Sequence, residues 1–281
     1  MEKADGVYLY GPITGYSLLQ VTQDRKDDAI FFMARNVKTF SPMRGQEEEL
    51  KGEMNIKGDY GLENPLLHPT TITTTDLNDI RHCPAMFGRF LGSPFVSTGS
   101  VIEVGFGYAL QKFISAAIEV DNIHCTPKFL SCLTYRSDSV NEARGFCLEH
   151  CSPGWSKADG VYLRGEKTLE LHPQFERDGI KVYQPADVQA IKTSGALVDF
   201  ARIRESRVAI IDLRGHETAD VDSLLDIGYA AALNKIILIV VEQGSKARYD
   251  QHPMIKGCAS APLLDDLGVA KRIAAKHLMP G

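Results

Sequence analysis

The chain repeats part of itself, and this repeat limits its possible folds more than any other feature. Residues 3–14 read KADGVYLYGPIT and residues 157–168 read KADGVYLRGEKT, with nine identities in twelve positions. A second match aligns residues 76–112 with residues 199–235 without a gap. The offsets are 154 and 123 residues, so the first half carries an insertion of about 31 residues. The pattern predicts a tandem duplication.

Strand-like and helix-like stretches alternate within the second copy. Apolar runs at residues 160–163, 180–183, 208–213 and 236–241 are separated by helical patterns near residues 169–177, 196–204, 221–233 and 263–276. Short apolar strands between helices are typical of a parallel sheet covered on both faces. We therefore predict an α/β fold of two tandem doubly wound, flavodoxin-like parallel-sheet domains. The domains are residues 1–150, with the insertion near 43–73, and residues 151–281.

Composition agrees with two globular domains. The chain has 281 residues, of which 44% are hydrophobic and 24% charged, and its net charge is −5. A net negative chain lacks the basic excess that a nucleic acid polymer would attract. The first residues show no signal-peptide pattern, and the longest apolar run, residues 236–241, is far below the ~20 residues that span a bilayer. We expect a cytoplasmic protein without a membrane partner.

Six cysteines in an intracellular chain are expected to be reduced and mostly buried. Four of them lie with two histidines in one stretch that invites a test for zinc: Cys125, Cys132, Cys147, Cys151, His124 and His150. The stretch contains no CxxC pair, and its spacing is poor for a zinc site. We expect no metal ion and no cofactor.

Ligands of doubly wound sheets bind beyond the carboxyl ends of the strands, which directs attention to residues 10–15 and 90–100. The segment STGSVIEVGFGYAL, residues 97–110, opens with small polar residues and then becomes helical, so free amides should face the ligand crevice. Glu103 lies near this helix start, where the helix dipole should hold it ionised. The alternative is an acid in the first turn that merely complements the dipole. Gly99, Gly105 and Gly107 would allow a ligand or a second backbone to approach closely.

Three ordered motifs carry a resemblance to a known family. They are VYLYGP (residues 7–12), TDLNDI (residues 75–80) and GSVIEVGFGYAL (residues 99–110), and SPMRG (residues 41–45) adds a fourth segment. Together they resemble the signatures of the nucleoside 2-deoxyribosyltransferases and of their relatives that hydrolyse nucleoside 5′-monophosphates. The resemblance covers the scaffold of both copies.

The resemblance implies a retaining glycosyl transfer. Glu103 matches the family nucleophile, Tyr8 matches the hydroxyl that orients it, and Asp76 matches the carboxylate near the departing base. Two carboxylates around a glycosidic carbon fit a double displacement through an oxocarbenium-like state. The same motifs imply further substrate-binding residues, which are Gly11, Pro12, Asn78, Gly99 and Ser100.

One departure from the family pattern concerns the substrate. Ser97 stands where transferases acting on free nucleosides carry an aspartate for the sugar 5′-hydroxyl. An aspartate would repel a 5′-phosphate, whereas a serine hydroxyl can donate to one, as in the phosphate-hydrolase branch. Arg44 or Arg81 could supply the countercharge, although a solvated or ion-paired arginine is the commoner case. A nucleotide substrate therefore stays open.

A second departure lies in the second copy. Asp226 replaces the glutamate, Asp222 replaces the first glycine of the motif, and the loop reads GEKT instead of GPIT. A nucleophile shortened by one methylene retreats by roughly 1.5 Å, and a misplacement of about 1 Å can cost ~100-fold in rate. We expect the second copy to be largely structural, although Asp199 and Asp220 leave an altered site open.

Duplication suggests how the first site is completed. Members of the family complete each site with a residue from a neighbouring subunit, so a fused pair would form an intrachain pseudo-dimer. The corresponding segment here is QHPMIKGCASA, residues 251–261, whose MIKG resembles the phosphate-hydrolase branch. We expect His252 or its neighbours to reach the Glu103 site, against the plain alternative of a surface-loop histidine. Further homo-oligomerisation stays open.

The leading function is a nucleoside 2-deoxyribosyltransferase that forms a glycosyl-Glu103 intermediate and passes the sugar to another base. The alternatives are a nucleoside 5′-monophosphate N-glycosidase, in which water takes the second step, and a non-catalytic nucleotide-binding module. The expected partners are a nucleoside or nucleotide and a free base. The insertion, residues 45–73, is either a lid over the site or a surface loop. The preferred base and sugar are not predicted.

Overall fold

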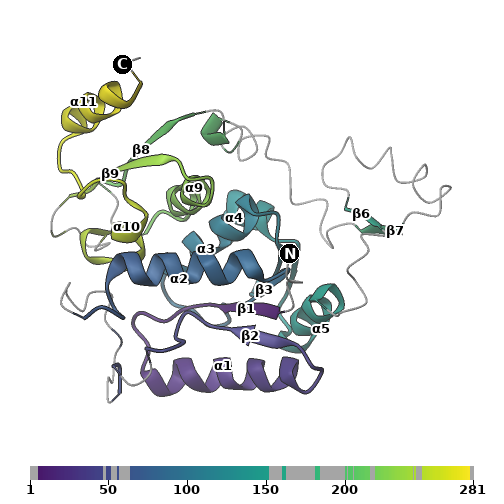
Figure 1. Ribbon diagram of the computed structural model, residues 1–281. Helices are drawn as coiled ribbons and strands as arrows, with labels where there is room; N and C mark the ends of the chain where they lie inside the picture. The colour runs from purple at the N-terminus through teal and green to yellow at the C-terminus, as the bar shows by residue number, and fades with distance from the viewer. Residues whose placement is uncertain are drawn as a thin grey trace.

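The chain folds as an α/β structure around a five-stranded parallel sheet flanked by helices (Figure 1). This computed structural model describes residues 6–46, 49–51, 56, 64–151, 160–162, 181–183, 200, 202–204, 206–215, 219–242, 244 and 249–278. Among these residues no helix combines the length and the apolar character needed to cross a membrane.

The main sheet has the strand order β2-β1-β3-β4-β5, with every neighbouring pair parallel. Its strands are β1 (Gly6–Tyr10), β2 (Lys38–Phe40), β3 (Ala85–Arg89), β4 (Phe113–Ala117) and β5 (Tyr135–Ser137). This is the flavodoxin-like order, in which the direction of winding reverses between β1 and β3. The crevice at this switch point is where a ligand is expected.

The connecting helices are α1 (Leu18–Met33), α2 (Pro69–His82), α3 (Thr98–Ala109), α4 (Pro127–Cys132) and α5 (Val140–Cys151). Their starts follow the sequence closely. Ser17 and Gln20 form a reciprocal capping box at the start of α1. Thr126 caps α4, whose first residue is a proline with a suitable φ and no amide hydrogen to satisfy.

Alternation along β1 separates two cores. Val7 and Leu9 point to one face of the sheet, where they pack with Phe32 of α1 and Cys147 of α5. Tyr8 and Tyr10 point to the opposite face, into the core that contains α2 and α3. Successive side chains of a strand face opposite sides, so the sequence position of Tyr8 directs it to the α3 side.

The second half forms two separate two-stranded parallel sheets in the described residues. They pair β6 (Gly160–Tyr162) with β7 (Lys181–Tyr183), and β8 (Val208–Asp212) with β9 (Ile236–Val240). The registers match the first half: Gly160 pairs with Lys181 as Gly6 does with Lys38, and Val208 pairs with Ile236 as Ala85 does with Phe113. The single second sheet that we expected is not seen in this part of the chain, because β6 does not pair with β8.

The helices of the second half agree in part with expectation. Helix α9 (Val221–Ala232) follows β8, and α11 (Leu267–Leu278) ends the described chain. Residues 200 and 202–204 are helical, as predicted for 196–204, whereas the helix expected near 169–177 lies outside the described residues. A short helix that we did not predict, α10 (Pro253–Cys258), follows a single 3-10 turn η2 (Tyr249–Gln251).

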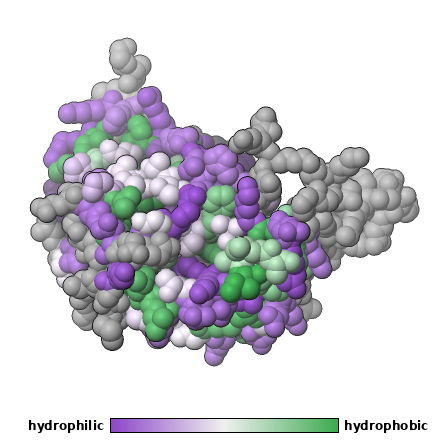
Figure 2. Space-filling model, turned by 60° about the horizontal axis from the view of Figure 1, so that its bottom comes forward, coloured by the Kyte–Doolittle hydropathy of each residue, from purple (hydrophilic) through white to green (hydrophobic). Residues whose placement is uncertain are grey.

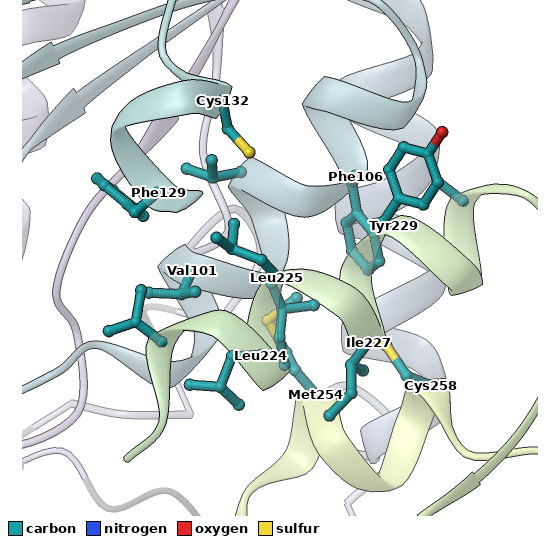
Figure 3. Packing of buried hydrophobic residues seen from close by; sticks show 14 of the residues in the cluster. Val101, Phe106, Phe129, Cys132, Leu224, Leu225, Ile227, Tyr229, Met254 and Cys258 are labelled. Carbon is teal, nitrogen blue, oxygen red and sulfur yellow. The ribbon is translucent and has the colours of Figure 1, made fainter. Parts of the chain in front are cut away.

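Helices α3 and α9 cross in direct contact and form the centre of the larger core. Figure 3 shows their side chains together with those of α4 and α10. A Cβ on Gly105 would lie 2.5 Å from the Leu225 carbonyl oxygen, and a Cβ on Gly228 would collide with the Ile102 carbonyl oxygen. These contacts are reciprocal, because each pair is related by the 123-residue offset. Glycine is required on both helices for this close approach.

Large exposed hydrophobic side chains are scattered over the first half, including Leu19, Ile30 and Met33 on α1. On the face shown in Figure 2, hydrophobic surface is broken up by hydrophilic surface. Such scattered exposure is normal for protein surfaces and does not by itself mark an interface.

Candidate active site

A cavity opens at the carboxyl ends of β1 and β3, beside the start of α3. The space inside it is about 610 Å³ when the open solvent at its mouth is included. The lining combines the loop after β1, the insertion, α2, α3 and α10. Its residues are Gly11, Ile13, Thr14, Pro42, Gln46, Leu50, Ile56, Leu67, Ile72, Asp76, Ser97, Gly99, Ser100, Glu103, His252, Pro253 and Met254.

Tyr8 and Glu103 meet at the floor of this cavity. The Tyr8 hydroxyl donates to Glu103 Oε1 over 2.7 Å, and both side chains are buried. Burial is the first cause that raises the pKa of Tyr8, and the charges of Asp76 and Glu103 raise it further. The phenol therefore keeps its proton and acts as a donor to the carboxylate.

Glu103 lies in the second turn of α3, because the helix begins at Thr98. The alternative of a first-turn acid that complements the dipole is therefore wrong. Only 2% of Glu103 is exposed, and burial, followed by the charge of Asp76, raises its pKa well above the usual range. Burial thus opposes the ionisation of Glu103 that we expected from the helix dipole. Loss of water outweighs a dipole whose effect fades beyond the first turn.

Asp76 enters the cavity from α2 and is 1% exposed. Within the described structure neither carboxylate oxygen of Asp76 makes a hydrogen bond of normal geometry, although the Tyr8 hydroxyl is close enough to lower the pKa of Asp76. Burial raises the pKa of Asp76 to about 7, and the nearby charge of Asp79 acts in the same direction. Asp76 and Glu103 therefore form a coupled pair of carboxyl groups in which the first ionisation opposes the second.

Arg25 of α1 supports the loop after β1, a role that sequence reasoning missed. Its Nη2 donates to the carbonyl oxygen of Gly11 over 2.9 Å. Gly11 has a φ of 140°, and a Cβ there would lie 2.7 Å from the carbonyl oxygen of Arg89. Only glycine fits at position 11, because any side chain would meet this oxygen and the positive φ. The positive charge of Arg25 also opposes the rise in the pKa of Glu103.

Ser97, Gly99 and Ser100 form the polar end of the cavity at the start of α3. The Ser97 hydroxyl donates to Ser100 Oγ over 2.9 Å and does not cap the helix. The first amides of α3 therefore lack a side-chain cap from Ser97 and can serve a ligand. The backbone amide of Ser97 itself donates to His124 Nε2 over 2.8 Å.

His252, Pro253 and Met254 line the same cavity from the second half of the chain. A Cβ on Gly99 would lie 3.1 Å from Met254 Sδ and 3.6 Å from His252 Cε1. Burial, aided by the charge of Lys256, lowers the pKa of His252 to about 4. Its Nδ1 is buried without a hydrogen-bond partner in the described structure. His252 is thus a neutral imidazole at the cavity wall.

The described part of the insertion covers the apolar end of the cavity. Leu50, Ile56 and Leu67 are buried with Val21 and Met43 in a small separate core. The Ile56 carbonyl oxygen accepts from the Gly15 amide over 2.9 Å, and the Ile56 amide donates to the Tyr16 carbonyl oxygen over 2.8 Å. These bonds tie the insertion to the loop after β1, so it forms a wall of the cavity. Residues 47–48, 52–55 and 57–63 lie outside the described part.

Three of the expected substrate-binding residues do not line the cavity. Pro12 is partly buried beside it, and Asn78 is exposed on α2. Arg44 donates to both carboxylate oxygens of Asp79 over 2.8 Å, and 54% of its side chain is exposed. The bidentate ion pair uses the guanidinium that we expected to face a phosphate. Arg81 likewise does not contribute to the described cavity wall.

Asp226 of α9, which corresponds to Glu103 of α3, has different neighbours. Lys128 Nζ lies 2.7 Å from the Asp226 carboxylate, and the Thr126 hydroxyl donates to Asp222 Oδ1 over 2.6 Å. Asp220 caps α9, because its carboxylate accepts from the Asp222 amide. The carboxylate also accepts from the Ser223 hydroxyl. Short helix α4 thus approaches α9 as α10 approaches α3, but it brings a lysine to the acidic residue.

All six cysteines are free, and five of them are buried. The described residues contain no group of three or more histidine, cysteine or acidic side chains arranged to hold a metal ion. The stretch weighed above for zinc is divided between separate environments. His124 packs against Phe90, whereas His150 stacks on Phe113.

Comparison with known proteins does not assign the chain. No family model matches it. No curated protein and no solved structure matches it either. What this cavity does must therefore be inferred from its own residues and distances.

Proposed function

We propose that the protein is a nucleoside 2-deoxyribosyltransferase, which cleaves an N-glycosidic bond and transfers the sugar to a second base. One observation carries the proposal: Glu103 and Asp76 line one cavity, and Glu103 accepts a hydrogen bond from the Tyr8 hydroxyl. The motifs that resemble this family contribute these three side chains. A buried carboxylate pair is also the arrangement that glycosyl transfer requires.

In the first step, a Glu103 carboxylate oxygen attacks the anomeric carbon of the bound nucleoside. The new C–O ester bond forms as the bond from this carbon to the base nitrogen breaks, and the electron pair of that bond leaves with the base. Asp76 in its protonated form gives its proton to the departing base. The base thereby leaves as a neutral molecule, which lowers the barrier to bond cleavage.

The reaction requires one placement of the proton within the carboxyl pair, and the hydrogen bonds favour it. The Tyr8 hydroxyl donates to Glu103 over 2.7 Å, whereas neither oxygen of Asp76 makes a hydrogen bond of normal geometry in the described structure. A hydrogen bond to the charged form favours ionisation, and burial without one favours the neutral acid. Both pKa values are raised, so the pair retains a proton, and we propose that its reactive form carries the negative charge on Glu103, the nucleophile, and the proton on Asp76, the acid.

In the second step, a nitrogen of the incoming base attacks the anomeric carbon, and the ester bond to Glu103 breaks. Asp76, now ionised, accepts the proton that the incoming base loses. The apolar wall from Leu50, Ile56 and Leu67 supports transfer to a base, because it favours a planar ring over water. Attack by water at the same carbon would give hydrolysis instead.

The second half is proposed to be a duplicated subunit that completes this site. Three observations support a tandem duplication. The strand registers of the two halves match, the glycine contact between α3 and α9 is reciprocal, and α4 and α10 occupy corresponding places. Fusing a symmetric pair would turn an intersubunit contact into an intrachain one. In this pseudo-dimer α10 contributes His252 and Met254 to the Glu103 cavity, and the acid of the partner half no longer has a catalytic role.

A second candidate is a nucleoside 5′-monophosphate N-glycosidase, which Ser97 favours. A serine at the start of α3 leaves room for a phosphate on the helix amides. Against it, the described cavity wall contains no lysine or arginine, and Arg44 is bound to Asp79. The structure therefore offers the phosphate only neutral donors, and we place the uncharged nucleoside first.

Incubation with deoxynucleosides and with deoxynucleoside 5′-monophosphates, each with and without a second base, tests the proposal. We expect free base to be released and a new nucleoside to form when a second base is present. Release without exchange would select the N-glycosidase. Ligand binding without release of base would contradict both reactions and leave a nucleotide-binding module.

A further inference from the structure

A buried histidine outside the cavity holds the polar end of the site. His124 follows β4, is 0% exposed, and packs its ring against Phe90 with ring centroids 4.6 Å apart. Phe129 of α4 covers the ring as well. Burial lowers the pKa of His124 to about 4, so the imidazole is neutral near pH 7. A neutral ring has one nitrogen that donates and one that accepts.

The hydrogen bonds assign the two ring nitrogens. The Ser97 amide can only donate, so His124 Nε2, 2.8 Å away, must be the bare acceptor. The proton then lies on Nδ1, 2.7 Å from Asn122 Oδ1. Asn122 is itself oriented, because its Nδ2 donates to the Phe90 carbonyl oxygen and to Glu119 Oε2 over 2.9 Å each.

We infer that His124 is a positioning residue for the candidate active site, acting through the Ser97 amide on the first turn of α3. This inference rests on the proposed function for its kinetic consequence. Ser97, Gly99 and Ser100 line the cavity at the start of α3. A shift of this turn would move the amides and hydroxyls that hold the substrate, while Glu103, one turn further along, would stay bonded to Tyr8.

The second half supplies a matched internal comparison. At the corresponding place in α9, the Asp220 amide donates to the Tyr249 hydroxyl. Each helix start is therefore held by an aromatic side chain from the segment after the neighbouring strand. His124 Nε2 and the Tyr249 hydroxyl oxygen both accept from a backbone amide at a helix start. This shared feature indicates that an acceptor at this place holds the helix start.

The kinetic test compares two variants. His124→Phe keeps the buried ring but removes the acceptor, and His124→Gln replaces it with an amide oxygen at a similar reach. We expect His124→Phe to raise KM for the nucleoside by about tenfold while kcat changes by less than about threefold. His124→Gln should restore KM to within about threefold of the wild type. Equal losses in kcat and kcat/KM in both variants would overturn the inference.

Tyr249→Phe is the matched control, because it removes the corresponding acceptor at the start of α9. We expect its KM to stay within about twofold of the wild type. A rise in KM equal to that of His124→Phe would mean that both substitutions act through general destabilisation, which contradicts a local positioning role.

Two measurements do not depend on activity. Nitrogen NMR of the wild-type histidines at pH 7 should show Nδ1 of His124 protonated and Nε2 bare, and a proton on Nε2 would overturn the inference even if His124→Phe failed to fold. Hydrogen exchange at the Ser97 amide should be slow in the wild type and in His124→Gln, and fast in His124→Phe. If the wild type releases no base from any nucleoside, the proposed function fails, and these two measurements still decide the role of His124.

Discussion

Glu103 on α3 and Asp226 on α9 occupy corresponding places in the two halves, yet opposite kinds of neighbour surround them. Glu103 accepts from the neutral Tyr8 hydroxyl and faces a cavity. Asp226 is paired with the ammonium of Lys128 over 2.7 Å. The first acid is open to a ligand, whereas the charge of the second is neutralised within the protein.

The short helices α4 and α10 each contribute one side chain to this difference. Both helices begin with proline, and their second residues are Lys128 and Met254. Lys128 pairs with Asp226, whereas Met254 lines the cavity that contains Glu103. An ammonium on α4 therefore neutralises the acid of the second half, whereas a thioether on α10 brings no charge to the first.

The largest expected effect comes from removing the acid in each half separately. Glu103→Gln should lower activity by at least about 1,000-fold, because the amide keeps the shape but cannot attack carbon. Asp226→Asn should leave kcat/KM within about twofold. Rates of base release for the two purified variants check this, and comparable losses in both would remove the distinction between the halves.

Exchanging the short-helix side chains should convert one environment into the other. Met254→Lys brings an ammonium beside Glu103, where an ion pair should lower activity by about 100-fold or more by weakening the nucleophile. Lys128→Met is the matched control. It should leave activity nearly unchanged and cost about 1–3 kcal/mol of stability, reduced from a fully buried pair because Asp226 is partly exposed. Full activity of Met254→Lys would contradict the account.

The helix starts differ at Ser97 and Asp220, and this difference should control the charge of the substrate. Ser97→Asp gives the first half the acid that the second half carries. We expect it to reduce use of a nucleoside 5′-monophosphate about tenfold or more relative to the parent nucleoside, by repulsion between the carboxylate and the phosphate. Ratios of kcat/KM for the two substrates measure the effect. An unchanged ratio would show that no phosphate lies near Ser97.

A smaller effect should appear in the pH profile. Burial raises the pKa of Asp76 to about 7, so the acid loses its proton as the pH rises through this value. Activity should therefore fall at alkaline pH, once the coupled pair loses its remaining proton, by about tenfold per pH unit at the limit. Asp76→Asn, which cannot titrate, should have a low rate without this alkaline decrease. Persistence of the same decrease in Asp76→Asn would assign it to another group.

The raised pKa of Asp76 should also make the free energy of unfolding depend on pH. The unfolded chain ionises Asp76 near its ordinary pKa of 3.8, whereas the folded chain holds the proton to about pH 7. The unfolded state therefore binds fewer protons between these values, and stability falls as the pH rises through them. Asp76→Asn should be more stable than the wild type at pH 8 by at least about 1 kcal/mol. Thermal or urea unfolding at pH 5 and pH 8 measures the difference.

Local pattern predicted β1, α3 and the loops after β1 and β3 that form the site, but not the short helix α10. The alternation of β1 directs Tyr8 toward α3, and glycines mark the crossing of α3 with α9. The roles that sequence reasoning missed all depend on distant partners. Arg44 pairs with Asp79 on another element, Lys128 reaches across to Asp226, and His124 is identified only through the Ser97 amide. A charged or titratable side chain does not reveal from its own position which partner it will meet.

The high pKa of Glu103 shows a different limit. Helix position predicted an ionised acid, but burial opposes the charge. Because burial depends on what the second half and the insertion place around α3, it cannot be read from the motif alone. For the same reason the sequence does not decide between a lid and a surface loop for the insertion, whereas the hydrogen bond from the Gly15 amide to the Ile56 carbonyl oxygen ties it to the site.

Trapping the glycosyl-enzyme tests the central claim most directly. Wild-type protein would be mixed with a deoxynucleoside, quenched with acid during turnover, digested, and analysed by mass spectrometry. The account predicts that the mass of the sugar is added to the peptide that contains Glu103 and that the Asp226 peptide is unchanged. A sugar attached to the Asp226 peptide, or base release with no adduct at any time after mixing, would contradict it.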